Sequence, residues 1–530
     1  MGFKGDVNLS QSQKAAKSVF IIIIFGIGSK ILGFIREALI AAKFGSGAET
    51  DTFFLVLTAT SLFTVMITRA INTTTIPVLS KIESLEGKGG KISHANNLLN
   101  ITLLTSLIIT VLAWIFAPVL LKVLAYGFEG EQYRLAILML RIGLFSIIFS
   151  AIVGVFRGYL QSEHRFIESA ASEFPFNLVY IFFLIFLTGI FGINGLMVTS
   201  VIAVAAQIIV QIPGLRKIGF RYKPIFDVKD KYVQRIYAMI PPILLSVVIA
   251  DVNKMVDRSL ASTLVDGSIS ALNYAHRIDT LVTGIFISAI VTVIFPIFAK
   301  EANKEKYDGL KSIVVKGLNV ALIITIPATV GLIILANPII KVAFQRGAFD
   351  ATATYMTSGA LVFYALGLIG TASRSILNRV FYALQDTKTP MINSAISVII
   401  NITLNFILIR YMAHRGLALA TSISATVTAI LLLYSLRKKI GALGISKLII
   451  CGLKALIASA VMGVTVYFLH STLHNALGTG FIREFTALFT TVGVGALVYF
   501  IIIYILKVKE VEWIVNIIKD KLGLDIKNNV

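Results

Sequence analysis

The sequence contains a single cysteine, Cys451, which lies in an apolar stretch of the 530-residue chain. One cysteine cannot form a disulfide within the chain, and it cannot build a cysteine cluster for a metal ion. Charged residues are also scarce at 14%, whereas 57% of the residues are hydrophobic and the mean hydropathy is +0.87. A soluble protein of this size needs far more polar surface, so the composition excludes that class.

Long polar segments are missing as well. No loop is large enough to form an extramembrane catalytic domain, which argues against a membrane-embedded glycosyltransferase or polymerase, and we expect no enzymatic activity. No basic soluble domain is present, so we expect no nucleic-acid partner. The first 17 residues are polar, and the apolar run after them lacks a small-residue cleavage site, so we expect that run to remain as a helix.

Apolar runs of 18 or more residues recur along the whole chain, and each is typical of a membrane-spanning helix. We predict an all-α integral membrane protein with about fourteen spanning segments. The net charge of +21 is concentrated in connectors such as 215–235 and 300–316, which would lie on the same side as the N-terminus. Because cytoplasmic loops are rich in Lys and Arg, both termini are expected in the cytoplasm.

The chain repeats itself at a nearly constant distance. "GLMVTS" at Gly195 and "GLALATS" at Gly416 are 221 residues apart, and so are the "LRK" sequences at Leu215 and Leu436. Six helices in each repeat would give two pseudo-symmetric lobes with a substrate between them, which is a recurring transporter plan. We expect an N-lobe at 1–220, a C-lobe at 221–440, and two additional helices with a C-terminal amphipathic helix at 441–530.

Several charges fall inside the apolar segments, where an ionised side chain costs about 2.5–3.5 kcal/mol at mid-bilayer. Such residues tend to face the protein interior or a wet cavity. The first helix is the clearest case, with "SKILGFIREALIAAKFG" at 29–45. Because basic groups outnumber acidic ones and arginine suits oxyanions, we expect an anionic substrate. The candidate residues are Lys30, Arg36, Glu37, Asp51, Arg69 and Arg277.

A second group of polar residues offers oxygen ligands. Asn401 and Asn405 are one helical turn apart, Thr421 lies on the next segment, and Asp257 lies on the seventh. These residues could hold Na⁺ as a coupling ion, or they could make ordinary hydrogen bonds between helices. No other cofactor is expected.

Four motifs resemble those of the MurJ (MviN) family of lipid II flippases, in the multidrug/oligosaccharidyl-lipid/polysaccharide exporter superfamily. They are "SKILGFIREALIAAKFGSGAETDTFF", "GSISALNYAHRIDTLVTGIF", "FQRGAFDATAT" followed by "FYALQDTKTP", and "GLALATS". The resemblance covers residues 17–440. It implies a two-lobed bundle with a central cationic cavity, and two extra helices that form a groove for a polyprenyl tail.

By this resemblance, Arg36 and Arg277 match essential cavity arginines, and Lys30 stands where many members have arginine. Glu37 and Asp51 match acidic residues of the family. The four oxygen-bearing residues named above fall near its proposed sodium site. One departure concerns the second helix, where Thr64 and Val65 replace an arginine pair and Arg69 follows a turn later.

The resemblance implies a transporter in the bacterial plasma membrane that moves lipid II from the inner to the outer leaflet by alternating access. We expect it to be a monomer. Its partners would be lipid II, or a related polyprenyl-diphosphate glycolipid, and membrane lipids. Because of the change in the second helix, a flippase for another undecaprenyl-diphosphate-linked glycolipid is the main alternative. A drug or cation antiporter of the same superfamily is the other, and the basic residues argue against it.

Overall fold

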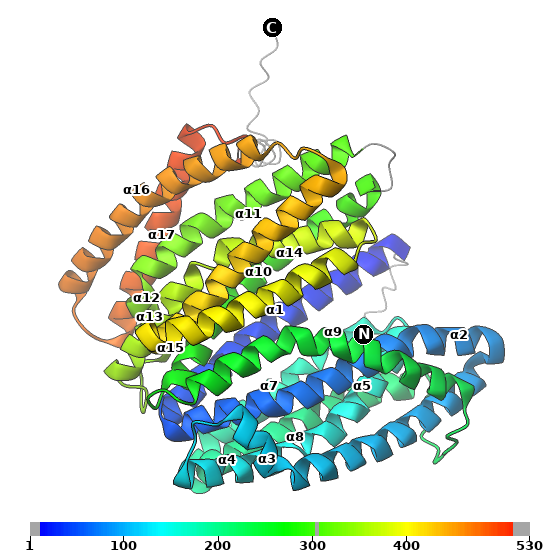
Figure 1. The fold of residues 1–530 in the computed structure, drawn as a ribbon. Coiled ribbons are helices and arrows are strands. Elements are labelled where there is room, and N and C mark those ends of the chain that lie inside the picture. The colour runs from blue at the N-terminus through cyan, green and yellow to red at the C-terminus, as the bar shows by residue number, and fades with distance from the viewer. Residues whose placement is uncertain (1–10, 303–306, 512–530) are drawn as a thin grey trace, which may run out of the picture. The chain divides into compact units, whose positions relative to one another are not determined.

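In the computed structural model, residues 11–302 and 307–511 are described, and every regular element in these two ranges is an α-helix (Figure 1). The chain forms two compact units, Met1–Ile269 and Ser270–Val530. The lobe boundary expected near residue 220 from the repeat remains a prediction. The expected C-terminal amphipathic helix falls largely on residues 512–530, outside the described residues.

The first unit is built around a long helix, α2, which packs against α5 and α9. Its buried core joins apolar side chains of α2 and α5 with those at the end of α8 and the start of α9. The helices of this unit are α1 (Gln11–Phe44), α2 (Ala48–Ile115), α3 (Ala117–Leu124), α4 (Gly130–Gly143), α5 (Ser146–Ser162), α6 (Phe166–Ala171), α7 (Glu173–Phe186), α8 (Thr188–Lys217) and α9 (Lys231–Ala261).

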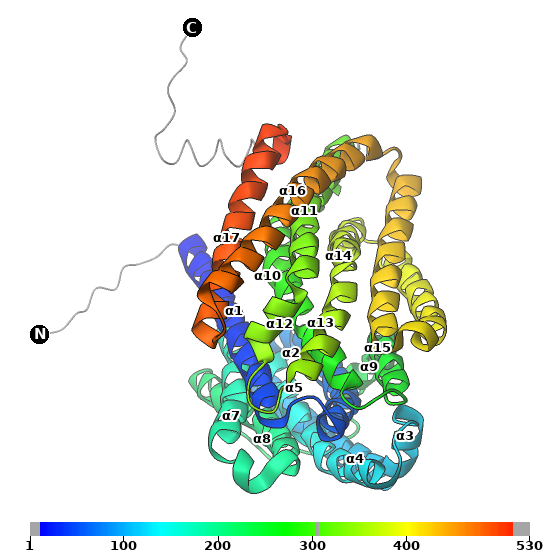
Figure 2. The ribbon, with the colours of Figure 1, turned by 90° about the vertical axis from the view of Figure 1, so that its left-hand side faces the viewer.

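The second unit begins within α10 and contains a core shared by α10, α11, α14 and the end of α15. The hairpin of α16 and α17 packs along α11 (Figure 2). The helices of the second unit are α10 (Ser268–Ala302), α11 (Asp308–Ile334), α12 (Ala336–Phe344), α13 (Ala351–Ala365), α14 (Leu368–Ala383), α15 (Lys388–Ile440), α16 (Ile445–Leu477) and α17 (Phe481–Ile505).

Two helices are too long for one crossing of a bilayer, and both contain a break. The 68 residues of α2 would extend roughly 100 Å at 1.5 Å per residue, against a hydrocarbon core of about 30 Å. Gly87, with φ 70°, divides it next to a charged stretch, and Ala413, with φ 50°, divides the 53-residue α15. Each of these helices therefore supplies two crossings.

The helices confirm the predicted fold class. In the described ranges, eight helical segments are long and apolar enough to span a membrane, or nine with the bent pair α13 and α14. Counting α2 and α15 twice, and adding α1, α9 and α10 at 31–35 residues each, gives about fourteen spans. The chain is therefore a multi-pass, all-helical membrane protein.

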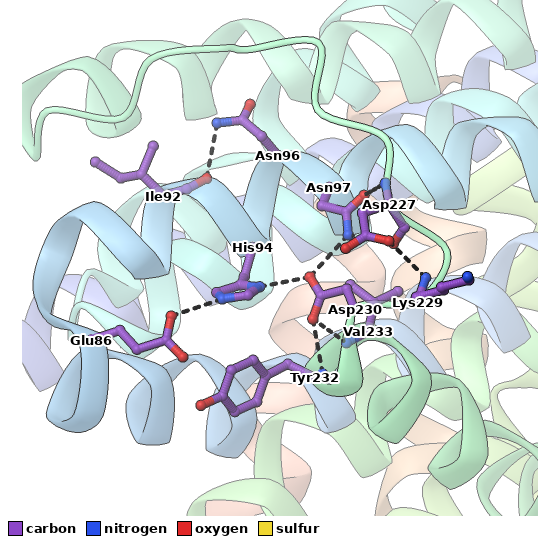
Figure 3. Close-up of polar contacts among 10 residues, drawn as sticks. All are labelled: Glu86, Ile92, His94, Asn96, Asn97, Asp227, Lys229, Asp230, Tyr232 and Val233. Atoms are coloured by element: carbon purple, nitrogen blue, oxygen red, sulfur yellow. Dashed lines mark hydrogen bonds and ion pairs between the residues drawn. The ribbon is translucent and has the colours of Figure 1, made fainter.

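A polar cluster joins the turn of α2 to the start of α9 in the first unit (Figure 3). His94 lies between two carboxylates, with Nδ1 2.6 Å from Asp230 and Nε2 2.9 Å from Glu86. Asp230 also caps α9 by accepting from the amide of Tyr232, while Asn97 donates to its other oxygen. The surrounding segment is rich in charge, which places this cluster outside the apolar spans.

The His94 cluster predicts a stability that depends on pH. Burial opposes protonation of His94, but the hydrogen bonds with Asp230 and Glu86 outweigh it and raise the pKa of the imidazole. A raised folded-state pKa contributes stability that is complete below the unfolded pKa of about 6.5 and is lost as the pH rises through the folded value. We therefore expect His94→Gln to lower the melting temperature more at pH 6 than at pH 9.

Thermal unfolding of the purified protein at the two pH values measures this difference, with His164→Gln as a control because His164 is exposed. An equal effect of His94→Gln at both pH values would show that His94 is not held as a cation by its two carboxylates.

Candidate functional site

Arg36 is the centre of a polar site between α1 and α7 in the first unit. Its Nη2 lies 2.7 Å from Oε1 of Glu37, and its Nη1 donates to Oδ1 of Asn177 at 3.3 Å. The guanidinium also lies 5.4 Å from the ring centroid of Phe176 and 5.0 Å from that of Tyr180. Because the side chain is only 12% exposed, the charge is stabilised by a carboxylate, an amide and two aromatic faces.

A second arginine, Arg157 on α5, forms a neighbouring polar contact with α7 and α8. Its Nη2 donates to Oγ of Ser172 at 2.9 Å and to Oε1 of Gln207 at 3.4 Å, and it lies 3.7 Å from Glu173. We did not predict a role for these residues. The available signal was the "SEFPFN" stretch, in which a carboxylate and an amide are four residues apart within a spanning helix.

The other predicted cations lie in different surroundings. Lys30 is partly exposed on α1, Arg69 is exposed on α2, and Arg277 is partly exposed on α10. Arg36, Lys30 and Arg69 belong to the first unit, whereas Arg277 belongs to the second. A cavity shared by Arg36 and Arg277 remains a proposal.

Asp51 makes a structural contact at the start of α2. It is buried, and its Oδ2 accepts from the backbone amide of Gly267 at 2.8 Å. Ser46 donates to the carbonyl of the same glycine at 3.1 Å. Gly267 has φ +89°, and a Cβ at this position would approach Ser46 Oγ to 2.9 Å. Asp51 therefore fixes the turn that leads into α10.

The amide residues predicted near a sodium site bind one another within α15. Asn405 donates to Oδ1 of Asn401 at 2.9 Å, and Asn401 donates to Oγ1 of Thr421 at 3.5 Å across the break. Both asparagines are fully buried. Asp257 lies on α9 in the other unit. In the described part of the chain, no group of three or more His, Cys, Asp or Glu side chains is placed to hold a metal ion.

The side-chain oxygens of Asn401, Asn405 and Thr421 in α15 are chemically suited to Na⁺, because hard cations prefer carbonyl and hydroxyl oxygens. Ordinary interhelical hydrogen bonding accounts for the same contacts.

These features define a class: a polytopic helical membrane protein with two arginines, Arg36 and Arg157, that make polar contacts within its spans, which is the pattern of a transporter rather than of a structural anchor. The sequence profile described as "Lipid II flippase MurJ" matches residues 40–515. The chain belongs to this family.

Several curated relatives and one solved structure are similar over nearly the whole chain. A "Probable lipid II flippase MurJ" of Rickettsia prowazekii is 28% identical over 93% of this chain and 98% of its own length. The protein of the same name from Vibrio cholerae is also 28% identical, over 94% of this chain and 97% of its own length. A structure titled "Lipid II flippase MurJ, inward closed conformation" is 25% identical and covers 92% of this chain and 98% of its own, with a TM-score of 0.77.

The fold extends to a wider group. An inward-facing multidrug MATE family transporter of the MOP superfamily, at 17% identity, covers 78% of this chain and 95% of its own with a TM-score of 0.67. At this identity the likeness concerns the fold alone.

Proposed function

We propose that this protein moves lipid II from the inner to the outer leaflet of a bacterial plasma membrane by alternating access, as a monomer with both termini in the cytoplasm. The observation that carries the proposal is a buried arginine, Arg36, which pairs with the carboxylate of Glu37 inside a membrane-spanning helix. The chain that contains this pair belongs to the MurJ family. A guanidinium that binds a carboxylate has the geometry to bind a phosphate.

Arg36 acts by exchanging partners. In the contact with Glu37 the carboxylate occupies one edge of the guanidinium, and contacts with the rings of Phe176 and Tyr180 fix the orientation of the guanidinium plane. A diphosphate that replaces the carboxylate keeps the guanidinium neutralised in a region of low dielectric constant. Arg277 and Lys30 supply further positive charge to the same headgroup, and the tail stays in lipid along α16 and α17.

The membrane potential favours this direction of movement. An inside-negative potential contributes about 2.3 kcal/mol per elementary charge per 100 mV. A diphosphate with two negative charges that moves outward gains roughly twice that amount, unless ions move with it.

Growth of cells depleted of their own lipid II flippase tests the proposal. We expect this chain to restore growth, while cells that need a flippase for a different undecaprenyl-diphosphate glycolipid are not rescued. Rescue of only the second kind of cell would assign the chain to the other glycolipid.

Sodium coupling through Asp257 predicts a dependence of transport on Na⁺. If Na⁺ binds at Asp257, then replacing Na⁺ with K⁺ should slow transport, and Asp257→Ala should slow it about tenfold or more because one charged ligand is lost. Asp266→Ala is the control, since Asp266 is exposed. Unchanged transport in both experiments would eliminate sodium coupling.

A further inference from the structure

A pocket of about 320 Å³ lies in the second unit, where α11 and α12 meet the ends of α16 and α17. This volume is within the range of small-ligand sites, about 300–1,000 Å³. Its lining includes apolar side chains such as Leu335, Pro338 and Val342. The polar lining comes from three elements: Asn337 and Lys341 of α12, His470, Ser471 and His474 of α16, and Glu484 of α17. None of these residues has a part in the transport site described above.

Most of the polar groups in this pocket can donate hydrogen bonds. The ammonium of Lys341 lies 2.7 Å from Oε1 of Glu484, which engages one of its three N–H donors and leaves two. The rings of His470 and His474 stack with centroids 6.2 Å apart. Nδ1 of His470 is buried and has no hydrogen-bond partner among the residues described.

Glu484 is the one carboxylate among the residues that line the pocket, and its charge is matched by Lys341. The remaining donors therefore face no competing anion of the protein. A tetrahedral oxyanion offers several acceptors in a small volume, and it can use ammonium, imidazole, hydroxyl and amide donors together. This donor set fits a phosphate better than it fits a cation.

The position of the pocket indicates where the phosphate comes from. His474 is in the last turn of α16 and Glu484 is in the first turn of α17, so the pocket lies at the end of the hairpin opposite Lys447. The α16 face that leads to it exposes apolar side chains, with Val464 60% and Phe468 64% exposed. A polar pocket at the end of a lipid-facing helix is placed at the level of lipid headgroups.

We propose that this pocket binds the phosphate of a membrane phospholipid, with Lys341, His470 and His474 as its principal donors. The acyl chains lie along the exposed face of α16. The bound lipid braces α12 against the α16–α17 hairpin. The phosphate pocket shares no residue with the headgroup site at Arg36, so its failure would leave the proposed function in place.

Native mass spectrometry of the full chain in detergent tests the proposal with two short-chain probes, dioctanoyl phosphatidylglycerol and dioctanoylglycerol, which differ in the phosphate-bearing head. We expect the wild type to bind the phosphatidylglycerol at least about tenfold more tightly. Two double variants should each remove most of this preference for phosphatidylglycerol: His470→Gln/His474→Gln and Lys341→Gln/Glu484→Gln. The second pair takes away both charges, so no unpaired carboxylate remains to unfold the protein.

Arg483→Gln is the matched control, because Arg483 is exposed beside Glu484 and does not line the pocket. It should bind as the wild type does. Competition by millimolar inorganic phosphate against phosphatidylglycerol distinguishes the source: weak competition assigns the site to a lipid, and full competition to the free anion, which would overturn the lipid assignment. Equal binding of the two probes, or unchanged binding by both double variants, would overturn the phosphate site itself.

Discussion

Arg36→Ala is expected to abolish transport while the protein remains folded and abundant. Arg36 is held by Glu37, Asn177 and two aromatic rings, and it is the buried cation that we assign to the diphosphate. Each charge-assisted hydrogen bond to such a group contributes about 1.5–3 kcal/mol, so its loss should weaken headgroup binding roughly 10- to 150-fold. The measurement is growth of cells that depend on this chain as their flippase, with protein abundance determined in parallel.

Two further variants separate binding from folding. Arg36→Ala/Glu37→Gln removes both charges of the pair, so a loss of transport in this variant cannot be attributed to an unpaired carboxylate. Lys43→Ala is the control, since Lys43 is exposed on the same helix. Normal growth with either Arg36 variant would refute the assignment of this residue to the substrate.

Among the substitutions proposed for this protein, Lys91→Met is expected to give the largest decrease in the free energy of unfolding. Lys91 has no exposed side-chain surface, lies 2.7 Å from Glu83, forms an ion pair with Glu163, and has its ammonium 5.3 Å from the ring centroid of Tyr159. Removing the cation leaves two carboxylates facing each other without a partner. Breaking a buried pair in this way lowers the free energy of unfolding by about 3–5 kcal/mol. Thermal unfolding and the yield of folded protein measure the effect.

The comparison with Lys88→Met isolates the role of burial, because Lys88 is exposed in the same segment. Lys91→Met/Glu163→Gln should recover part of the lost stability, since one unpaired charge is removed. If Lys91→Met melts at the same temperature as Lys88→Met, the buried ion pairs do not stabilise the turn of α2.

The sequence predicted the fold well because spanning helices are specified locally. A run of about 20 apolar residues must be helical in a bilayer, where no water is available to bind its backbone groups. The break at Gly87 lies in the polar "EGKGG" stretch, which signals a turn. The break at Ala413 lies in the "YMAHRG" stretch, where Arg415 and Gly416 interrupt the apolar pattern, but the sequence does not signal that the positive φ falls on an alanine, which favours helix.

The contacts around the candidate residues were predicted only in part, because they join distant segments. Arg36 was identified from its charge within an apolar run, but its partner Asn177 is 141 residues away. Asp51 was predicted to serve the substrate, and its contact with Gly267, 216 residues away, gives it a structural role as well. The α15 amides were predicted to lie together because a spacing of four places them on one helix face, and Asn405 does donate to Asn401.

Reconstitution into vesicles tests the central claim most directly. Fluorescent lipid II is placed in both leaflets, and a membrane-impermeant reagent quenches the headgroups that reach the outer surface. Vesicles with the wild-type chain should lose the protected fraction of the signal, whereas vesicles with Arg36→Ala, or with no protein, should retain it. Equal protection in wild-type and protein-free vesicles, with the chain folded in the bilayer, would contradict transport of lipid II by this protein.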